Sequence, residues 1–139
     1  MISQITGVVS HIDLKFAVVN TGTPEAGVGY KVFATSDTLS SITVGSRTSL
    51  WTYLAVRDNA MDLYGFTSPA ELAFFELLIT VSRIGPKTAL GILNAAAIET
   101  IQNAIHTEDT SGLTKVSGIG KKVAEKIVLE LKDKIGEMG

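Results

Sequence analysis

The sequence predicts two consecutive domains, an all-β barrel over residues 1–66 and an all-α domain over residues 67–139. Short β-rich runs separated by turn residues fill the first part, and apolar residues at helical spacing replace them in the second. A twelve-residue segment of the second part then recurs 35 residues later. With 139 residues and 45% hydrophobic content, the chain can bury one large core or two small ones.

The barrel is predicted from the density of its short strands. The clearest runs are residues 2–9, 30–35, 49–56 and 63–66. Gly27 and Gly29 give a flexible backbone where the second run begins, and Asp58-Asn59 separates two apolar runs as a hairpin tip does. At least five strands fit into these 66 residues. A closed barrel suits them because closure leaves no exposed sheet edge.

The helical domain begins with a capping signal. Ser68 can cap a helix, Pro69 suits its first position, and Glu71 completes a capping box. Apolar residues then follow at helical spacing, first Leu72, Phe75, Leu78 and Ile79 and later Val123, Ile127, Leu131 and Ile135. We expect both stripes to form core, because an apolar helical stripe packs more often than it binds a ligand.

The repeat aligns residues 81–92 with residues 116–127. Seven of the twelve positions are identical, because Val81, Ser82, Ile84, Gly85, Lys87, Ala89 and Ile92 recur as Val116, Ser117, Ile119, Gly120, Lys122, Ala124 and Ile127. Each copy predicts a helix, a tight glycine-containing turn with an apolar residue in it, and a second helix. This is a helix-hairpin-helix pattern, and its duplication predicts two such motifs.

Such a hairpin can bind phosphate. Glycine allows close approach, so N–H groups of the turn and of the next helix's first turn can face an anion. We expect Ile84 and Ile119 to point inward as anchors. The predicted DNA-binding residues are Arg83, Gly85, Lys87, Thr88, Gly118, Gly120, Lys121, Lys122 and Lys126. Contacts of this kind bind the backbone without reading bases, and two copies could hold both strands across a minor groove. The alternative is that each glycine pair only makes a tight interhelical turn.

Charge and motifs limit the other functions. The net charge is −2, but residues 83–139 carry eight Lys or Arg against four in residues 1–82, so a phosphate site is expected in the second part. No phosphate-binding loop of a nucleotide hydrolase and no third glycine of a dinucleotide site is present. Cysteine is absent, and His11 and His106 are isolated in sequence. We therefore expect no catalytic residues, no metal and no cofactor.

Two rival functions remain. A DNA-repair glycosylase or lyase would need an acid after the hairpin, and Asp133 is the only Asp that follows the second one. A protein-interaction module would show no salt-sensitive affinity for DNA. The N-terminus lacks the features of a signal peptide, and no run of 18 apolar residues occurs, so we expect a cytoplasmic protein without a membrane segment.

Over essentially its whole length, the chain resembles the RuvA family of bacterial proteins that bind Holliday junctions. The strings that carry the resemblance are Val56-Arg57-Asp58, Leu63-Tyr64-Gly65-Phe66, Ile84-Gly85-Pro86-Lys87 with Ala89, and Gly118-Ile119-Gly120-Lys121-Lys122. The resemblance implies an OB-fold barrel, two helix-hairpin-helix motifs and a homotetramer, or an octamer on DNA, that accepts a four-way junction. It also implies the partners RuvB, a motor ATPase, and RuvC, a resolvase, in recombination, DNA repair and the SOS response of a bacterial cytoplasm.

The resemblance also implies an acidic pin at Asp58 and Asn59, whose carboxylates would repel phosphates that converge at the junction centre. A simple turn dipeptide is the alternative. Three departures stand out. Asn59 replaces the second acid of the family's pin, and Arg83 replaces a glycine in the first hairpin. The chain also ends at Gly139, where the family continues to a third, motor-binding domain, so we expect a truncated form that binds junctions without supporting motor-driven branch migration.

Overall fold

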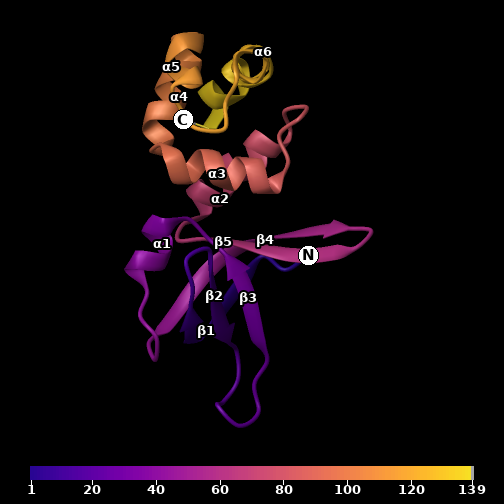
Figure 1. Cartoon of the computed structure of the whole chain (residues 1–139), viewed down its shortest axis with the longest axis vertical. Coiled ribbons are helices and arrows are strands. Elements are labelled where there is room, and N and C mark those ends of the chain that lie inside the picture. The colour runs from indigo at the N-terminus through magenta and orange to yellow at the C-terminus, as the bar shows by residue number, and fades with distance from the viewer. Residues whose placement is uncertain (139) are drawn as a thin grey trace. The chain divides into compact units, whose positions relative to one another are not determined.

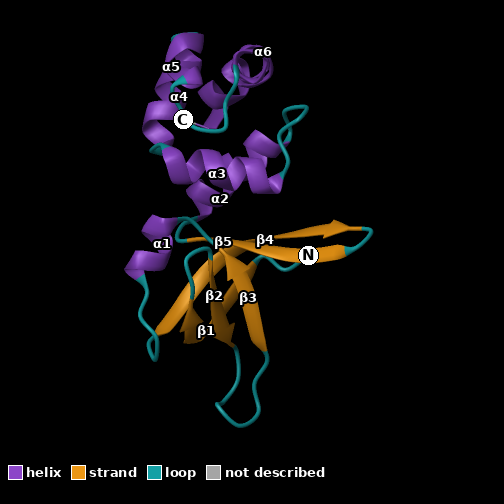
Figure 2. Ribbon diagram, viewed as in Figure 1, coloured by secondary structure: helices purple, strands orange, loops and turns teal. Residues whose placement is uncertain are grey.

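Two units make up the computed structural model, which describes residues 1–138 and the side chains of residues 1–136. The division falls after Leu72. Strands dominate the first unit and helices the second (Figure 2). The expected end of the chain at Gly139 lies outside the described residues.

Five strands form the first unit of the described chain, and they close into a barrel in the order β1-β2-β3-β5-β4. They are β1 (Gln4–Ile12), β2 (Phe16–Asn20), β3 (Gly29–Phe33), β4 (Arg47–Arg57) and β5 (Ala60–Phe66). The β3–β5 pair is parallel and the other pairs are antiparallel. A short helix, α1 (Ser36–Ser41), connects β3 to β4 (Figure 1). This connectivity is that of an OB-fold, so the predicted barrel is confirmed.

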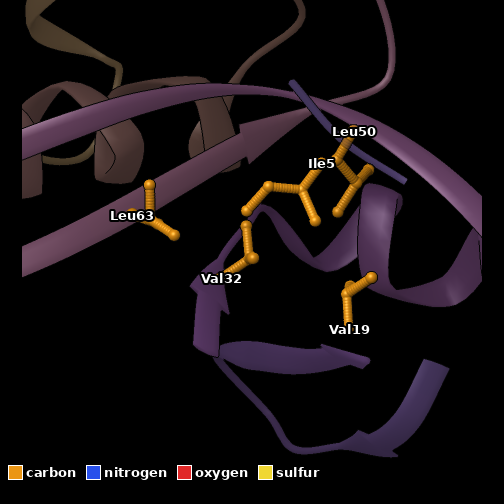
Figure 3. Packing of buried hydrophobic residues seen from close by; sticks show 5 residues of the cluster. All are labelled: Ile5, Val19, Val32, Leu50 and Leu63. Carbon is orange, nitrogen blue, oxygen red and sulfur yellow. The ribbon is translucent and has the colours of Figure 1, made fainter. Parts of the chain in front are cut away.

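Each strand contributes one side chain to the centre of the barrel. The cluster consists of Ile5, Val19, Val32, Leu50 and Leu63, all at most 6% exposed (Figure 3). Alternation along each strand sends these residues inward and their neighbours outward. Gly65 belongs to the same interior, because a Cβ built on it would overlap the Val32 side chain. Packing inside the barrel therefore explains why the Leu63–Phe66 string has a glycine at this position.

The structure corrects two details of the predicted strands. The run expected over residues 30–35 ends as a strand at Phe33, because Thr35 instead caps α1 by accepting the N–H of Thr38 at 3.3 Å. The strand β2 was not among the runs singled out from the sequence. It has only five residues and follows an exposed turn, so its pattern is weak outside the context of the barrel.

The helices are α2 (Pro69–Ile79), α3 (Pro86–Ala95), α4 (Ile98–His106), α5 (Thr110–Thr114) and α6 (Lys121–Met138). The predicted start of α2 is confirmed, since the Ser68 hydroxyl accepts the N–H of Glu71 at 3.2 Å. The carboxylate of Glu71 accepts a hydrogen bond from the Thr67 hydroxyl at 3.0 Å. The sequence had assigned that carboxylate to the reciprocal half of a capping box.

Both apolar stripes take part in core. Phe75 and Leu78 of α2 and Ile127 and Leu131 of α6 are fully buried. In the second unit, α6 packs against α4 and α5. Val123, at the start of the α6 stripe, is only half-buried. Within the described residues, no helix has the length and apolar character that crossing a membrane requires.

Candidate nucleic-acid interface

The first hairpin joins α2 to α3 through residues 80–85. Its turn is closed by backbone hydrogen bonds from the N–H of Val81 to the carbonyl of Leu78 and from the N–H of Ile84 to the carbonyl of Val81, both 3.1 Å. The carbonyl of Gly85 then accepts the first helical bond of α3, from Ala89 at 2.9 Å. The chain therefore reverses within six residues and enters α3 with Gly85 as its N-cap.

The second hairpin repeats this pattern 35 residues later, between α5 and α6. Val116 donates to Leu113 at 3.0 Å, Ile119 donates to Val116 at 3.1 Å, and Ala124 donates to Gly120 at 2.9 Å. Each distance agrees within 0.1 Å with its counterpart in the first hairpin. The predicted duplication is therefore a duplication of backbone structure. It also includes Leu78 and Leu113, a fully buried pair just before the window compared in the sequence.

A left-handed residue stands at the same place in both turns. Gly118 has φ 95° and its counterpart Arg83 has φ 74°. Glycine takes this conformation without a steric penalty, whereas a residue with a Cβ is strained by about 1–2 kcal/mol. The substitution of arginine for glycine therefore leaves the shape of the turn unchanged and adds strain to the first hairpin.

Buried apolar residues anchor each turn to the core. Ile84 and Ile119 are each only 4% exposed, which confirms that they point inward. The next buried pairs of the repeat, Ala89 with Ala124 and Ile92 with Ile127, are fully buried. Because matching residues fill matching places in the core, the two turns are held by equivalent packing.

The start of each following helix is open. Gly85 caps α3 without any side-chain hydrogen bond, and a Cβ built on Gly85 or Gly120 would meet no atom within 4 Å. The first N–H groups of a helix have no partner inside the helix and carry its positive dipole end. In α3 these groups belong to Gly85, Lys87 and Thr88, since Pro86 has none. Each hairpin therefore offers an accessible set of donors suited to an anion.

The predicted binding residues differ in their surroundings. The exposed ones are Arg83, Gly85, Lys87, Thr88, Gly118, Gly120, Lys121 and Lys122. Lys126 is half-buried, and its Nζ donates a hydrogen bond to the Ser82 hydroxyl at 2.8 Å. The second turn in the same way lies beside α3, because a Cβ on Gly118 would be 3.9 Å from Cγ1 of Ile92. Each hairpin thus lies against the second helix of the other.

The long hairpin of β4 and β5 carries the remaining predicted site. Arg57 pairs with Ala60, so the loop consists of Asp58 and Asn59, and both are exposed. The predicted hairpin tip is therefore confirmed, and Figure 1 shows it extending beyond the rest of the barrel. Arg57 forms an ion pair with Asp62 at 3.3 Å, while Asp58 takes part in no ion pair among the described residues. Within the described part of the chain, the carboxylate at the tip therefore has no cation in ion-pair contact.

Comparison with known proteins agrees with both units. The family model "RuvA N terminal domain" matches residues 1–65, and the model "SAM-like Helix-hairpin-helix tandem" matches residues 75–133. A protein of Chloroflexus aurantiacus is 45% identical over 97% of this chain and 68% of its own length. The chain belongs to the RuvA family.

Other RuvA proteins match the chain as extensively. The one from Renibacterium salmoninarum is 47% identical over 97% of this chain, and the one from Mycobacterium avium is 42% identical over all of it. These relatives are named "Holliday junction branch migration complex subunit RuvA". The chain spans 61% of the length of the first of these two and 68% of the second.

The RuvA chain offers no evident metal centre in its described part, where no three His, Cys, Asp or Glu side chains gather. Tyr64, within the family string, lies on β5, where it pairs with Tyr53 of β4 in the same hairpin. Burial raises the pKa of its phenol, the negative charge of Asp62 raises it further, and Arg57 partly opposes this.

Sequence patterns missed one feature of the RuvA interface, the partner of Lys126, because that contact joins residues 44 positions apart.

Proposed function

We propose that this chain binds four-way DNA junctions by their structure, without reading their sequence, and holds them open for branch migration by a partner ATPase. The observation that carries the proposal is the equivalence of the two hairpins. The same three backbone hydrogen bonds shape both turns, and each turn leads through a glycine with open space beside it into the next helix. Two equivalent anion sites in one unit suit a ligand with regularly spaced phosphates.

In this proposal the hairpins bind phosphates mainly through backbone N–H groups. Those of Gly85 and Gly120 lie beside open space, where a phosphate oxygen can approach closely. The exposed ammonium groups of Lys87, Lys121 and Lys122 add attraction at the rim. Because none of these groups must reach a base edge, affinity depends on backbone geometry and on salt rather than on sequence. The chain itself has a binding role and leaves the chemistry to its partner.

The exposed loop of Asp58 and Asn59 acts in this proposal as the pin at the junction centre. The single carboxylate of Asp58 repels phosphates that drift inward, and Asn59 contributes no charge, so the repulsion is weaker than that of two acids. We expect Asp58→Asn to leave affinity for linear duplex unchanged and to lower the fraction of bound junctions in the open square form. Fluorescence energy transfer between labelled junction arms measures that fraction, and an unchanged fraction would contradict the role of the pin.

Assembly belongs to the proposal as well. The names of the relatives describe a subunit of a branch migration complex. We propose that four copies form a ring on the junction, or eight as two rings, and that the motor RuvB and the resolvase RuvC join them in the bacterial cytoplasm. A four-fold ring would bring four pins to the centre and eight hairpins to the four arms, which matches the symmetry of a four-way junction.

A competition binding assay tests the proposal. The chain is mixed at fixed salt with a labelled four-way junction and challenged with unlabelled junction or with linear duplex of the same total sequence. The proposal predicts that duplex competes much less effectively than junction, whatever the sequence of the arms. Equal competition would refute junction recognition while leaving DNA binding intact. No binding of either DNA would refute the proposed function and favour a protein-interaction module.

A further inference from the structure

One hydrogen bond connects the two hairpins directly. The Nζ of Lys126, in the second turn of α6, donates to the hydroxyl of Ser82 in the first hairpin at 2.8 Å. Ser82 immediately precedes the left-handed Arg83. The bond therefore links the helix that follows the second turn to the most sharply bent part of the first turn.

The repeat shows that the serine of the second turn has no equivalent lysine in α3. Ser82 recurs as Ser117, but Lys126 corresponds to Gly91 in α3. A Cβ built on Gly91 would meet no atom within 4 Å, although α3 does lie beside the second turn through Ile92 and Gly118. The backbone thus brings both turns near the partner helix, and of the two serines only Ser82 is seen to bond a lysine among the described residues.

The surroundings of Lys126 separate it from the other lysines of the interface. Lys121 and Lys122 are exposed at the first turn of α6, whereas Lys126 is half-buried one turn later. Its ammonium already donates to a protein hydroxyl. A lysine that only attracts phosphate has no need of such a partner, because a mobile ammonium in water reaches a phosphate oxygen from many positions.

We propose that Lys126 is a positioning residue, which acts through Ser82 to fix the spacing and orientation of the two hairpin turns. This inference rests on the proposed binding of DNA by both hairpins. Two sites on one body bind one duplex tightly only when their separation matches the separation of the phosphates. A fixed separation also lowers the entropy that is lost on binding. In this role Lys126 raises affinity without contacting a phosphate.

The first part of the test asks whether the link exists in the free protein. Urea unfolding is measured for the unaltered chain, for Ser82→Ala, for Lys126→Met and for the double variant. We expect each single variant to lower the midpoint slightly and the double variant to lower it by less than the sum, because both remove the same bond. Additive changes would show that the two side chains do not interact and would overturn the proposal.

The second part measures affinity for linear duplex at several salt concentrations. Ser82→Ala and Lys126→Met should each weaken binding by roughly three- to tenfold, the range expected for one exposed hydrogen bond, and the double variant should bind no worse than either. The salt slope should stay unchanged for both. Ser82→Thr keeps the hydroxyl and should restore affinity. Ser117→Ala is the matched control, since its counterpart lysine is absent, and should bind like the unaltered chain.

The outcomes separate this inference from the proposed function. If Lys126→Met lowers the salt slope by about one unit while Ser82→Ala has no effect, Lys126 is a phosphate contact and the positioning role is wrong. If the unaltered chain fails to bind duplex or junction, the proposed function falls, and the positioning role falls with it. The non-additive unfolding result would in that case still establish the bond between Ser82 and Lys126 as structural.

Discussion

Replacing Gly118 with alanine tests the left-handed backbone conformation of the second hairpin separately from its side-chain packing. Gly118 has φ 95°, a conformation that a residue with a Cβ adopts only with strain. The added Cβ would lie 3.9 Å from Cγ1 of Ile92, which is an ordinary van der Waals contact. Steric overlap therefore contributes nothing, and the measured change in stability reports the backbone alone.

The magnitude follows from two opposing effects. A left-handed residue with a Cβ costs about 1–2 kcal/mol in the folded state. Alanine also has less conformational freedom than glycine in the unfolded chain, and this difference stabilises the folded state by about 0.4–1 kcal/mol. We therefore expect Gly118→Ala to lower the free energy of unfolding by about 1 kcal/mol, or to lower Tm by roughly 4–8 °C if the helical unit unfolds as a domain of its own size.

Urea denaturation followed by circular dichroism measures this change. Gly91→Ala is the matched control, because Gly91 lies inside α3 and its Cβ would meet nothing within 4 Å. Alanine in a helix interior is more favourable than glycine by roughly 0.5–1 kcal/mol, so this control should stabilise the protein. The two identical substitutions thus have opposite predicted signs. A stabilising effect of Gly118→Ala would refute the left-handed turn and with it the structural equivalence of the hairpins.

Three further predictions concern binding, packing and pH. Lys122→Ala should weaken duplex binding to a similar degree for unrelated sequences and lower the salt slope by about one unit, so a sequence-dependent loss in titrations would contradict backbone recognition. Ile84→Ala should cost about 2–5 kcal/mol in urea unfolding, since Ile84 is 4% exposed, and a loss below about 1 kcal/mol would mean that the anchor is dispensable. The Tyr64 phenol should titrate above its ordinary pKa of 10.0 because it is buried, as ultraviolet titration against Tyr64→Phe would show. Its contribution to stability is complete below pH 10.0 and is lost as the pH rises through the higher pKa of the folded state, and titration at the ordinary pKa would contradict the burial.

The duplicated hairpins were predictable because their information is local. Seven identities in twelve positions define each turn, its buried isoleucine and the helix that follows. The left-handed conformation of Arg83 was harder to predict, because arginine disfavours that region. Only the equivalent position of a glycine in the second turn indicates it. Packing of Ile84 and Ala89 in the core holds the turn in place against that local preference.

Two kinds of feature were not predictable from sequence patterns, a very short helix and a contact between residues far apart in the chain. The helix α1 has only six residues, and the sequence around its cap Thr35 predicts the end of a strand instead, because threonine favours strands. The partner of Lys126 depends on how α6 packs beside the first turn, a contact between residues 44 positions apart. The charge of Lys126 alone indicated only a phosphate contact. The sequence therefore predicted which residues belong to the interface better than it predicted how they are held there.

The most direct test of the account follows the backbone amides of both hairpins by nuclear magnetic resonance. A ¹⁵N-labelled chain is titrated with two linear duplexes of unrelated sequence. The account predicts that the amide signals of Gly85, Lys87, Gly120 and Lys122 shift together, with the same apparent Kd and in the same way for both duplexes. Shifts confined to one hairpin, shifts centred on the barrel, or shifts that differ between the two sequences would contradict paired binding of the phosphate backbone.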